Sequence, residues 1–201
     1  MLAVCHTVMV EGAGDSLKYS ASSPDELALI MGSKEVGIVY NRRSASTISL
    51  RVGNPNNGSV TDEEYEALVE FPFDSTRKRM SLLVKNLTTG RFYLMAKGAD
   101  SIMLPRIKID IQTQQRVEAD LYKFACEGLR TLVFSKKELT AKEYTDFNST
   151  YQSLKTSIDS RKEEKLNDLF NSMERDLTYL GGSAIEDKLQ DGVADTIERI
   201  M

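Results

Sequence analysis

The residues best suited to binding chemistry lie at positions 71–80. Two aromatic residues, Phe71 and Phe73, end a predicted strand, a polar turn follows, and three cations at 77–79 begin the next predicted strand. An aromatic face can stack on a flat base, and a neighbouring cation attracts a phosphate group or a ring nitrogen. This stretch therefore fits a site for a flat, negatively charged small molecule.

Side chains alternate across a strand, and this alternation separates the three cations. Lys78 falls on the same face as Met80 and the apolar residues beyond it, whereas Arg77 and Arg79 share the other face. Lys78 is then the cation that we expect above an apolar floor. The plainer alternative is that both phenylalanines are core residues and that residues 77–79 are a solvated edge.

Three further positions suit a binding role. Lys97 precedes Gly98 at the end of a predicted strand, where a glycine lets a ligand approach the backbone closely. Arg130 lies where a predicted helix gives way to a strand, and Glu26 lies in the first turn of another helix. Each also has a structural interpretation: an exposed lysine in a turn, a surface arginine beside a glycine cap, and a carboxylate that complements the helix dipole.

The sequence lacks the usual elements of an independent catalytic centre. It contains neither a GxxxxGK[ST] phosphate loop nor a GxGxxG turn after a strand, and His6 is its single histidine. We therefore predict no catalytic residues and no metal site of its own. The two cysteines, Cys5 and Cys126, indicate a reducing compartment, and we expect Cys5 and His6 to be core residues of an apolar strand.

Length and composition indicate one globular domain over residues 1–201. The chain has 201 residues, 41% of them apolar, with 26 basic and 30 acidic side chains and a net charge of −4. This balance and the lack of a basic tail argue against nucleic acid as a partner. No stretch approaches the ~18 apolar residues that cross a bilayer, and no signal peptide is evident, so we expect a soluble, cytosolic piece.

Periodicity predicts a mixed fold. Strands are predicted at 2–10, 17–21, 37–40, 47–52, 66–73, 77–85, 91–97, 129–134 and 177–185, and helices at 24–37, 112–126, 140–158, 160–176 and 189–201. The hairpins indicate an antiparallel sheet. We therefore expect an α+β (α/β) fold with a twisted antiparallel sheet of about six to seven strands flanked by helices.

Six segments, taken together, resemble a known family. They are CHTV at 5–8, SPDE at 23–26, FDSTRKRMS at 73–81, KGAD at 97–100, GLRTL at 128–132 and AIEDKLQ at 184–190. In this order they closely resemble the nucleotide-binding domain of P-type ATPases. The SPDE, RKRM and AIEDKLQ forms look like the phospholipid-translocating (flippase) branch of that family.

The resemblance implies an ATP pocket. In that family's pattern Phe73 would stack on adenine, Glu26 would lie near the adenine amino group, and Arg130 would reach the ribose or the phosphate chain. Lys78 and Lys97 would line the pocket, with Gly98 giving close approach. Contacts of lesser weight are implied for Ser75, Met80 and Thr131.

The resemblance also implies a larger parent protein. The family's DKTGT, TGDK and TGDGxND motifs are absent here, so this chain could not itself form an aspartyl-phosphate or move lipid. We expect a monomeric cytosolic domain of an integral membrane pump. It would bind ATP or ADP, with Mg²⁺ held mainly by the phosphorylation domain. Its partners would be the phosphorylation and actuator domains, with an accessory subunit as a further partner of the parent.

Two other functions remain open at this stage. A non-enzymatic interaction domain could bind a protein or an anionic head group, with the charged helices at 140–176 as a docking face. A free-standing hydrolase fits the residues least well, because no catalytic set is evident.

Overall fold

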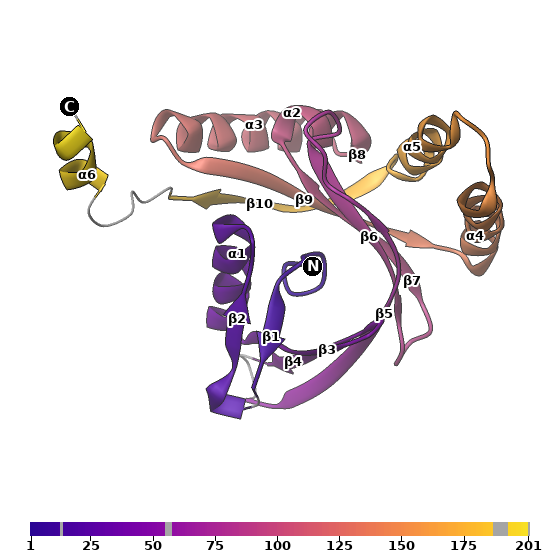
Figure 1. Ribbon diagram of the computed structural model, residues 1–201, viewed down its shortest axis with the longest axis horizontal. Coiled ribbons are helices and arrows are strands. Elements are labelled where there is room, and N and C mark those ends of the chain that lie inside the picture. Colours follow the sequence, from indigo (N-terminus) through magenta and orange to yellow (C-terminus); the bar gives the residue numbers. More distant parts are fainter. Residues whose placement is uncertain (13, 55–57, 187–192, 201) are drawn as a thin grey trace.

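A twisted eight-stranded sheet forms the centre of the computed structural model, which describes residues 1–12, 14–54, 58–186 and 193–200 (Figure 1). Its strands follow the order β3-β4-β5-β6-β7-β9-β10-β8. Every neighbouring pair is antiparallel except β10 and β8. The strands are β3 (Ile38–Ser44), β4 (Thr47–Gly53), β5 (Val60–Phe71), β6 (Arg79–Asn86), β7 (Phe92–Gly98), β8 (Ile107–Lys108), β9 (Arg130–Leu139) and β10 (Leu177–Ile185).

Helices and a short hairpin cover the sheet. The hairpin pairs β1 (Met9–Glu11) with β2 (Lys18–Ser20). The helices are α1 (Pro24–Glu35), α2 (Asp100–Met103), α3 (Ile111–Cys126), α4 (Ala141–Thr156), α5 (Lys162–Met173) and α6 (Val193–Ile200), with 3-10 turns η1 (Gly14–Ser16) and η2 (Leu104–Arg106). No helix in these described ranges is long and apolar enough to cross a membrane.

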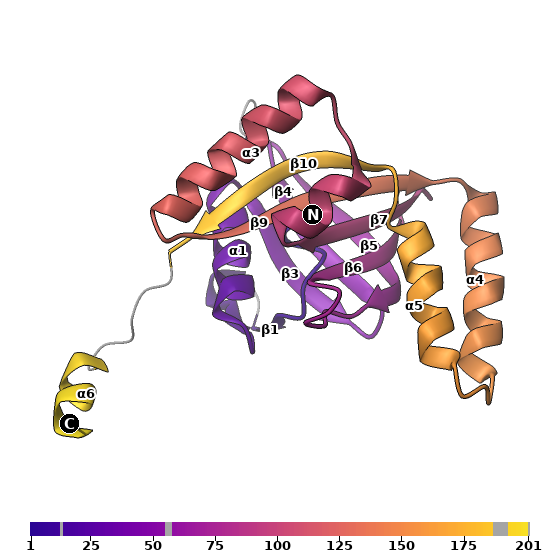
Figure 2. The same cartoon turned by 90° about the horizontal axis from the view of Figure 1, so that it is seen from above.

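The sheet has an apolar core on each face. The N-terminal core joins residues 3–8, α1, β3 and β4 to Met80, Leu82, Val84 and Met95 of the central strands. The helical core joins α3, α4 and α5 to the residues of the central strands that point to the other face of the sheet, such as Leu83 and Leu94. Figures 1 and 2 show α1 and the β1–β2 hairpin on one side of the sheet and α3 on the other. Strands β6 and β7 are therefore buried on both faces, as a central strand between two layers requires.

Residues in the first turn or at the N-cap determine where the helices begin. Pro24 occupies the first turn of α1, where a missing N–H costs nothing, and Asp25 and Glu26 follow it. Asp110 caps α3 through its side chain, and Thr140 and Glu143 form a reciprocal capping box at α4. These caps fix where α3 and α4 begin, and so how they cover the sheet.

A buried carboxylate ties α5 to the start of β6. Glu174, fully buried just after α5, accepts hydrogen bonds from Arg77 Nη2 at 2.5 Å, Arg79 Nε at 2.7 Å and Ser81 Oγ at 2.6 Å. Arg77 and Arg79 are only 7% and 3% exposed. The alternative that residues 77–79 form a solvated edge is therefore wrong for both arginines, because both are buried and paired with the single carboxylate of Glu174.

The same network braces the turn between β5 and β6. Arg77 Nη1 donates to the Pro72 carbonyl at 2.9 Å, and its guanidinium carbon lies 5.6 Å from the centre of the Phe170 ring. Asp74 Oδ1 accepts from the backbone N–H groups of Thr76 and Arg77 at 2.7 and 2.8 Å. The turn is held from both ends, so the side chains it carries have defined positions.

The expected α+β class is confirmed, with several local differences. The described sheet has eight strands rather than six to seven, because β8 is two residues long and too short for a periodicity signal. Residues 2–8 form turns, bends and irregular backbone rather than a strand, although Cys5 and His6 are buried as expected. Lys78 does not share the Met80 face: its φ of 51° breaks the strand alternation, and its side chain is exposed. Residues 189–192 and 201 of the last predicted helix lie outside the described residues.

Replacing Glu174 by Gln should destabilise the domain by about 3–5 kcal/mol, because two buried guanidinium groups lose their counter-charge. Urea unfolding monitored by circular dichroism measures the change. Glu164→Gln, an exposed carboxylate on α5, is the matched control and should change stability by less than about 0.5 kcal/mol. Equal effects of the two variants would contradict the structural role of Glu174.

Candidate functional site

A cavity of about 590 Å³ lies between α1 and the ends of β5, β6 and β7. Its size falls within the range of about 300–1,000 Å³ typical of small-molecule sites. We call it the α1 cavity. It is lined by Thr7, Ser22, Ser23, Asp25, Glu26, Leu29, Glu70, Pro72, Phe73, Met80, Lys97, Gly98 and Leu132.

An ion pair forms one wall of the α1 cavity. Lys97 Nζ lies 2.6 Å from Glu26 Oε1, while Thr7 donates to Glu26 Oε2 from its backbone nitrogen at 3.0 Å and from Oγ1 at 2.6 Å. Burial alone would raise the pKa of Glu26, but the hydrogen bonds from Lys97 and Thr7 outweigh burial, and this pKa lies below its usual value. Glu26 is therefore a fixed anion, and Lys97 is held at the wall by it.

Phe73 lies on the braced turn after β5 and presents an open ring to the same cavity. Its side chain is 64% exposed, whereas Phe71 is fully buried and stacks on Phe170 with ring centres 4.0 Å apart. The alternative that both are core residues therefore holds for Phe71 alone. An exposed aromatic ring on a rigid turn is a surface on which a flat ligand can stack.

The floor of the cavity comes from the central strands. Met80 is buried and pairs with Lys97 in the β6–β7 register, so both project to the N-terminal face of the sheet. Gly98 follows on β7. A Cβ atom there would lie 2.6 Å from the Lys78 carbonyl oxygen and 2.6 Å from Arg79 Cβ. Strand packing therefore explains this glycine without a ligand, which differs from our expectation that it gives a ligand close approach.

Four other predicted contacts do not line the α1 cavity. Ser75 and Lys78 are exposed, and Thr131 is half-buried opposite Ala184 in the β9–β10 pairing. Arg130 is at the margin: its Nη1 lies 3.1 Å from Oδ1 of Asp25, a lining residue. The structure thus brings together Glu26, Phe73, Met80, Lys97 and Gly98, and their contact with a nucleotide stays a prediction.

Sequence reasoning missed eight of the thirteen lining residues, and Thr7 and Glu70 illustrate why. Thr7 holds Glu26 in place; it belongs to the CHTV segment of the family pattern, but no site role was predicted for it. Glu70 is an outward-facing residue of β5 and resembles any solvated strand carboxylate. Long-range contact, rather than local pattern, brings both to the cavity.

The groups around the α1 cavity suit binding of a small molecule. They offer an aromatic ring, a thioether, an ammonium and a carboxylate around an open space, which suits a flat ring with polar edges. Among the described residues no group of three or more His, Cys, Asp or Glu side chains could hold a metal ion. Fold and cavity together define a ligand-binding α+β domain.

Comparison with known proteins identifies the family. Residues 1–192 match the family model of the P-type ATPase, cytoplasmic domain N, and the chain belongs to this family. This domain is nucleotide-binding, and its family implies use of ATP and Mg²⁺.

Over its whole length the chain also matches proteins that are named phospholipid-transporting ATPases. The chain is 36% identical to Phospholipid-transporting ATPase 10 of Arabidopsis thaliana and 39% identical to Phospholipid-transporting ATPase DRS2 of Saccharomyces cerevisiae, in each case over 100% of the chain. It is 38% identical to Phospholipid-transporting ATPase IC of Homo sapiens, again over 100% of the chain. The chain spans 17%, 14% and 15% of these three proteins, respectively. The predicted resemblance to the flippase branch is thereby confirmed.

Replacing Gly98 by Ala should cost about 1–3 kcal/mol of stability, because the added methyl group overlaps the β6 backbone. Gly32→Ala is the matched control. A Cβ at Gly32 meets nothing within 4 Å, and alanine in this helix should stabilise by about 0.5–1 kcal/mol. Chemical denaturation of both variants measures the difference, and a neutral Gly98 variant would contradict the close strand approach.

Stability should fall as pH decreases from 6.5 towards 4, by up to about 3 kcal/mol from His6 alone. Burial lowers the pKa of His6 from 6.5 to about 4, so the unfolded chain binds the proton first and protonation favours unfolding. Its Nδ1 also accepts from the Val8 N–H at 3.1 Å, which a proton there would prevent.

NMR titration of the single imidazole gives this pKa directly, and urea unfolding across the same range gives the stability. His6→Gln should reduce the pH dependence of stability between pH 6.5 and 5, where few carboxylates titrate. The N-terminal amine, whose pKa burial also lowers, contributes equally in both proteins. A His6 pKa near 6.5 in the folded protein would refute the assignment.

Proposed function

We propose that this chain is the ATP-binding domain of a phospholipid-transporting P-type ATPase. It would hold ATP so that the γ-phosphate reaches an aspartate on a phosphorylation domain of the same parent chain. The observation that supports this most directly is the α1 cavity, in which Phe73 and the Lys97–Glu26 pair flank one open space. The family and the transporters among the relatives support the reaction and its setting.

Adenine recognition follows from the chemistry of the lining. The open face of Phe73 offers stacking, Met80 adds a polarisable floor, and the Lys97 ammonium can approach a ring nitrogen or the ribose. The Glu26 carboxylate accepts hydrogen bonds, which suits an exocyclic amino group. Arg130 would reach the phosphate chain by exchanging its Asp25 partner for the ligand.

Separation of the base-binding domain from the reacting groups is physically reasonable. Phosphoryl transfer depends mainly on positioning and charge stabilisation, so one domain can hold the base while another supplies the nucleophile. Mg²⁺ would arrive with the nucleotide and take its protein ligands from the phosphorylation domain. In this proposal residues 1–201 form one cytosolic domain of a membrane protein, next to phosphorylation and actuator domains.

A domain that holds mainly base and ribose should bind weakly alone. We expect a Kd on the order of 0.1–1 mM for ATP, or about −4 to −5.5 kcal/mol. The chain alone should release no phosphate from ATP above background. The transported lipid would be selected by other parts of the parent.

Replacing Phe73 by Ala should weaken ATP binding by roughly 1–3 kcal/mol, because the base loses its stacking surface. NMR titration with ATP measures the affinity and locates it at Phe73, Lys97 and Glu26. Phe73→Tyr, which keeps the ring, should restore most of the affinity. Tyr122→Ala removes another exposed aromatic residue on α3 and should change nothing.

Competition separates this function from the interaction-domain alternative. A nucleotide site prefers ATP or ADP over inorganic phosphate at the α1 cavity, whereas a simple basic patch binds any anion of equal charge. If millimolar ATP produces no shifts around Phe73 and Lys97, the proposed function fails.

A further inference from the structure

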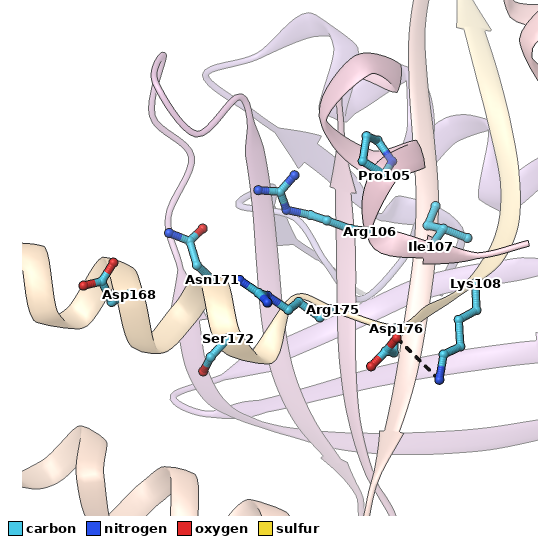
Figure 3. Close-up of a pocket in the computed structure, with 9 residues that line it drawn as sticks. All are labelled: Pro105, Arg106, Ile107, Lys108, Asp168, Asn171, Ser172, Arg175 and Asp176. Carbon is cyan, nitrogen blue, oxygen red and sulfur yellow. Dashed lines mark ion pairs between the residues drawn. The ribbon is translucent and has the colours of Figure 1, made fainter.

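A second cavity lies near the start of β6, on the face of the sheet that carries α5. The end of α5 and β8 border it. Its volume is about 810 Å³, larger than that of the α1 cavity. Residues of η2 and β8 form one wall, and the end of α5 with the two residues after Glu174 forms the other (Figure 3). We call it the α5 cavity. None of its lining residues belongs to the lining of the α1 cavity.

The charges that line the α5 cavity are only partly compensated. Lys108 Nζ lies 3.4 Å from Asp176 Oδ1, which accounts for one cation and one anion. Arg175 is exposed and has no hydrogen bond or ion pair within the described part of the chain. Arg106 is half-buried, and its Nη1 donates to the Ile102 carbonyl at 2.7 Å, a partner without charge. Asp168 is the remaining lining acid.

The wall behind these side chains adds positive charge. Arg77 and Arg79 share the single carboxylate of Glu174, which leaves an excess of one positive charge in a buried network. Arg79 also donates to the Asn171 side-chain oxygen, and Asn171 lines the cavity. Burial lowers the pKa of Arg106, and the charges of Arg79 and Arg175 act in the same direction. Cations therefore crowd one place on a chain whose net charge is −4.

The directions of the two arginine side chains agree with this charge distribution. Figure 3 shows the guanidinium groups of Arg106 and Arg175 directed to the side of the cavity where Asn171 lies, away from the Lys108–Asp176 pair. The two arginines come from different segments, η2 and the link between α5 and β10, so a ligand between them would be held from two sides. A planar guanidinium offers paired donors that match a phosphate group better than a point charge does.

We propose that the α5 cavity is an anion site that binds a phosphate monoester group between Arg106 and Arg175. A doubly charged phosphate compensates the lining and the buried network together, which a single carboxylate cannot do. The phosphate can belong to a free small molecule or to a phosphorylated side chain, and both present the same group. The two cavities share no lining residue, so phosphate binding here does not require nucleotide in the α1 cavity.

The test is NMR titration of the whole chain with inorganic phosphate and with O-phosphoserine, each at constant ionic strength set with chloride. Both ligands should shift the resonances of Arg106, Arg175 and Asn171 in a saturable manner. Acetate and glutamate are the carboxylate comparison and should bind at least about tenfold more weakly, because they carry fewer charged acceptor oxygens. A stronger response to O-phosphoserine than to phosphate would indicate a modified side chain as the source.

Arg175→Gln should weaken phosphate binding about tenfold, because hydrogen bonds between charged groups are the strong ones. This exposed residue makes no hydrogen bond or ion pair among the described residues, so folding should be unaffected. Arg106→Lys keeps the charge but loses the paired donors and should also weaken binding. Arg42→Gln, at the β3 edge of the sheet opposite β8, removes the same charge and should leave binding unchanged.

Three outcomes would overturn the phosphate site. One is an equal response to chloride, acetate and phosphate. Another is an equal loss of binding in the Arg42 and Arg175 variants. The third is a phosphate response confined to Phe73 and Lys97, which would place the anion in the α1 cavity and leave the nucleotide proposal standing.

Discussion

The structure depends most on one carboxylate, Glu174, which is the shared counter-charge of two buried arginines at the start of β6. Without this carboxylate, burial of the two guanidinium groups would strongly destabilise the fold, because an unpaired buried charge lowers the free energy of unfolding. Through Arg77 the network also holds the Pro72 carbonyl and so the turn that carries Phe73. The order of the turn on one face of the sheet therefore derives from an ion pair on the other.

Strands β6 and β7 connect these two faces. Arg79 and Ser81 project towards Glu174, while Met80 and Lys97, paired in register, project towards α1. The candidate site is thus built from rigid central strands, one helix start and one braced turn. Such a construction favours recognition without rearrangement, since few groups need ordering when a ligand arrives.

The sequence allowed the class of fold, most helices and five lining residues of the α1 cavity to be predicted. Phe73, Met80, Lys97, Gly98 and Glu26 were accessible because aromatic and charged types stand next to strand ends and match a family pattern. Lys78 was misplaced because a positive φ cannot be read from alternation. The role of Glu174 was not predicted, because Glu174 lies 97 residues from Arg77 and only the folded topology brings them together. Thr7 was missed for the same reason.

Helix α1 holds two neighbouring acids that are tied to different strands. Glu26 is anchored to Lys97 of β7 in a sheltered position, whereas Asp25 faces Arg130 of β9 with the arginine side chain 52% exposed. Dissolved ions screen exposed pairs far more than sheltered ones. Added salt should consequently weaken the Asp25–Arg130 pair while the Glu26–Lys97 pair persists, and the buried Ile30 keeps this helix packed on the N-terminal core.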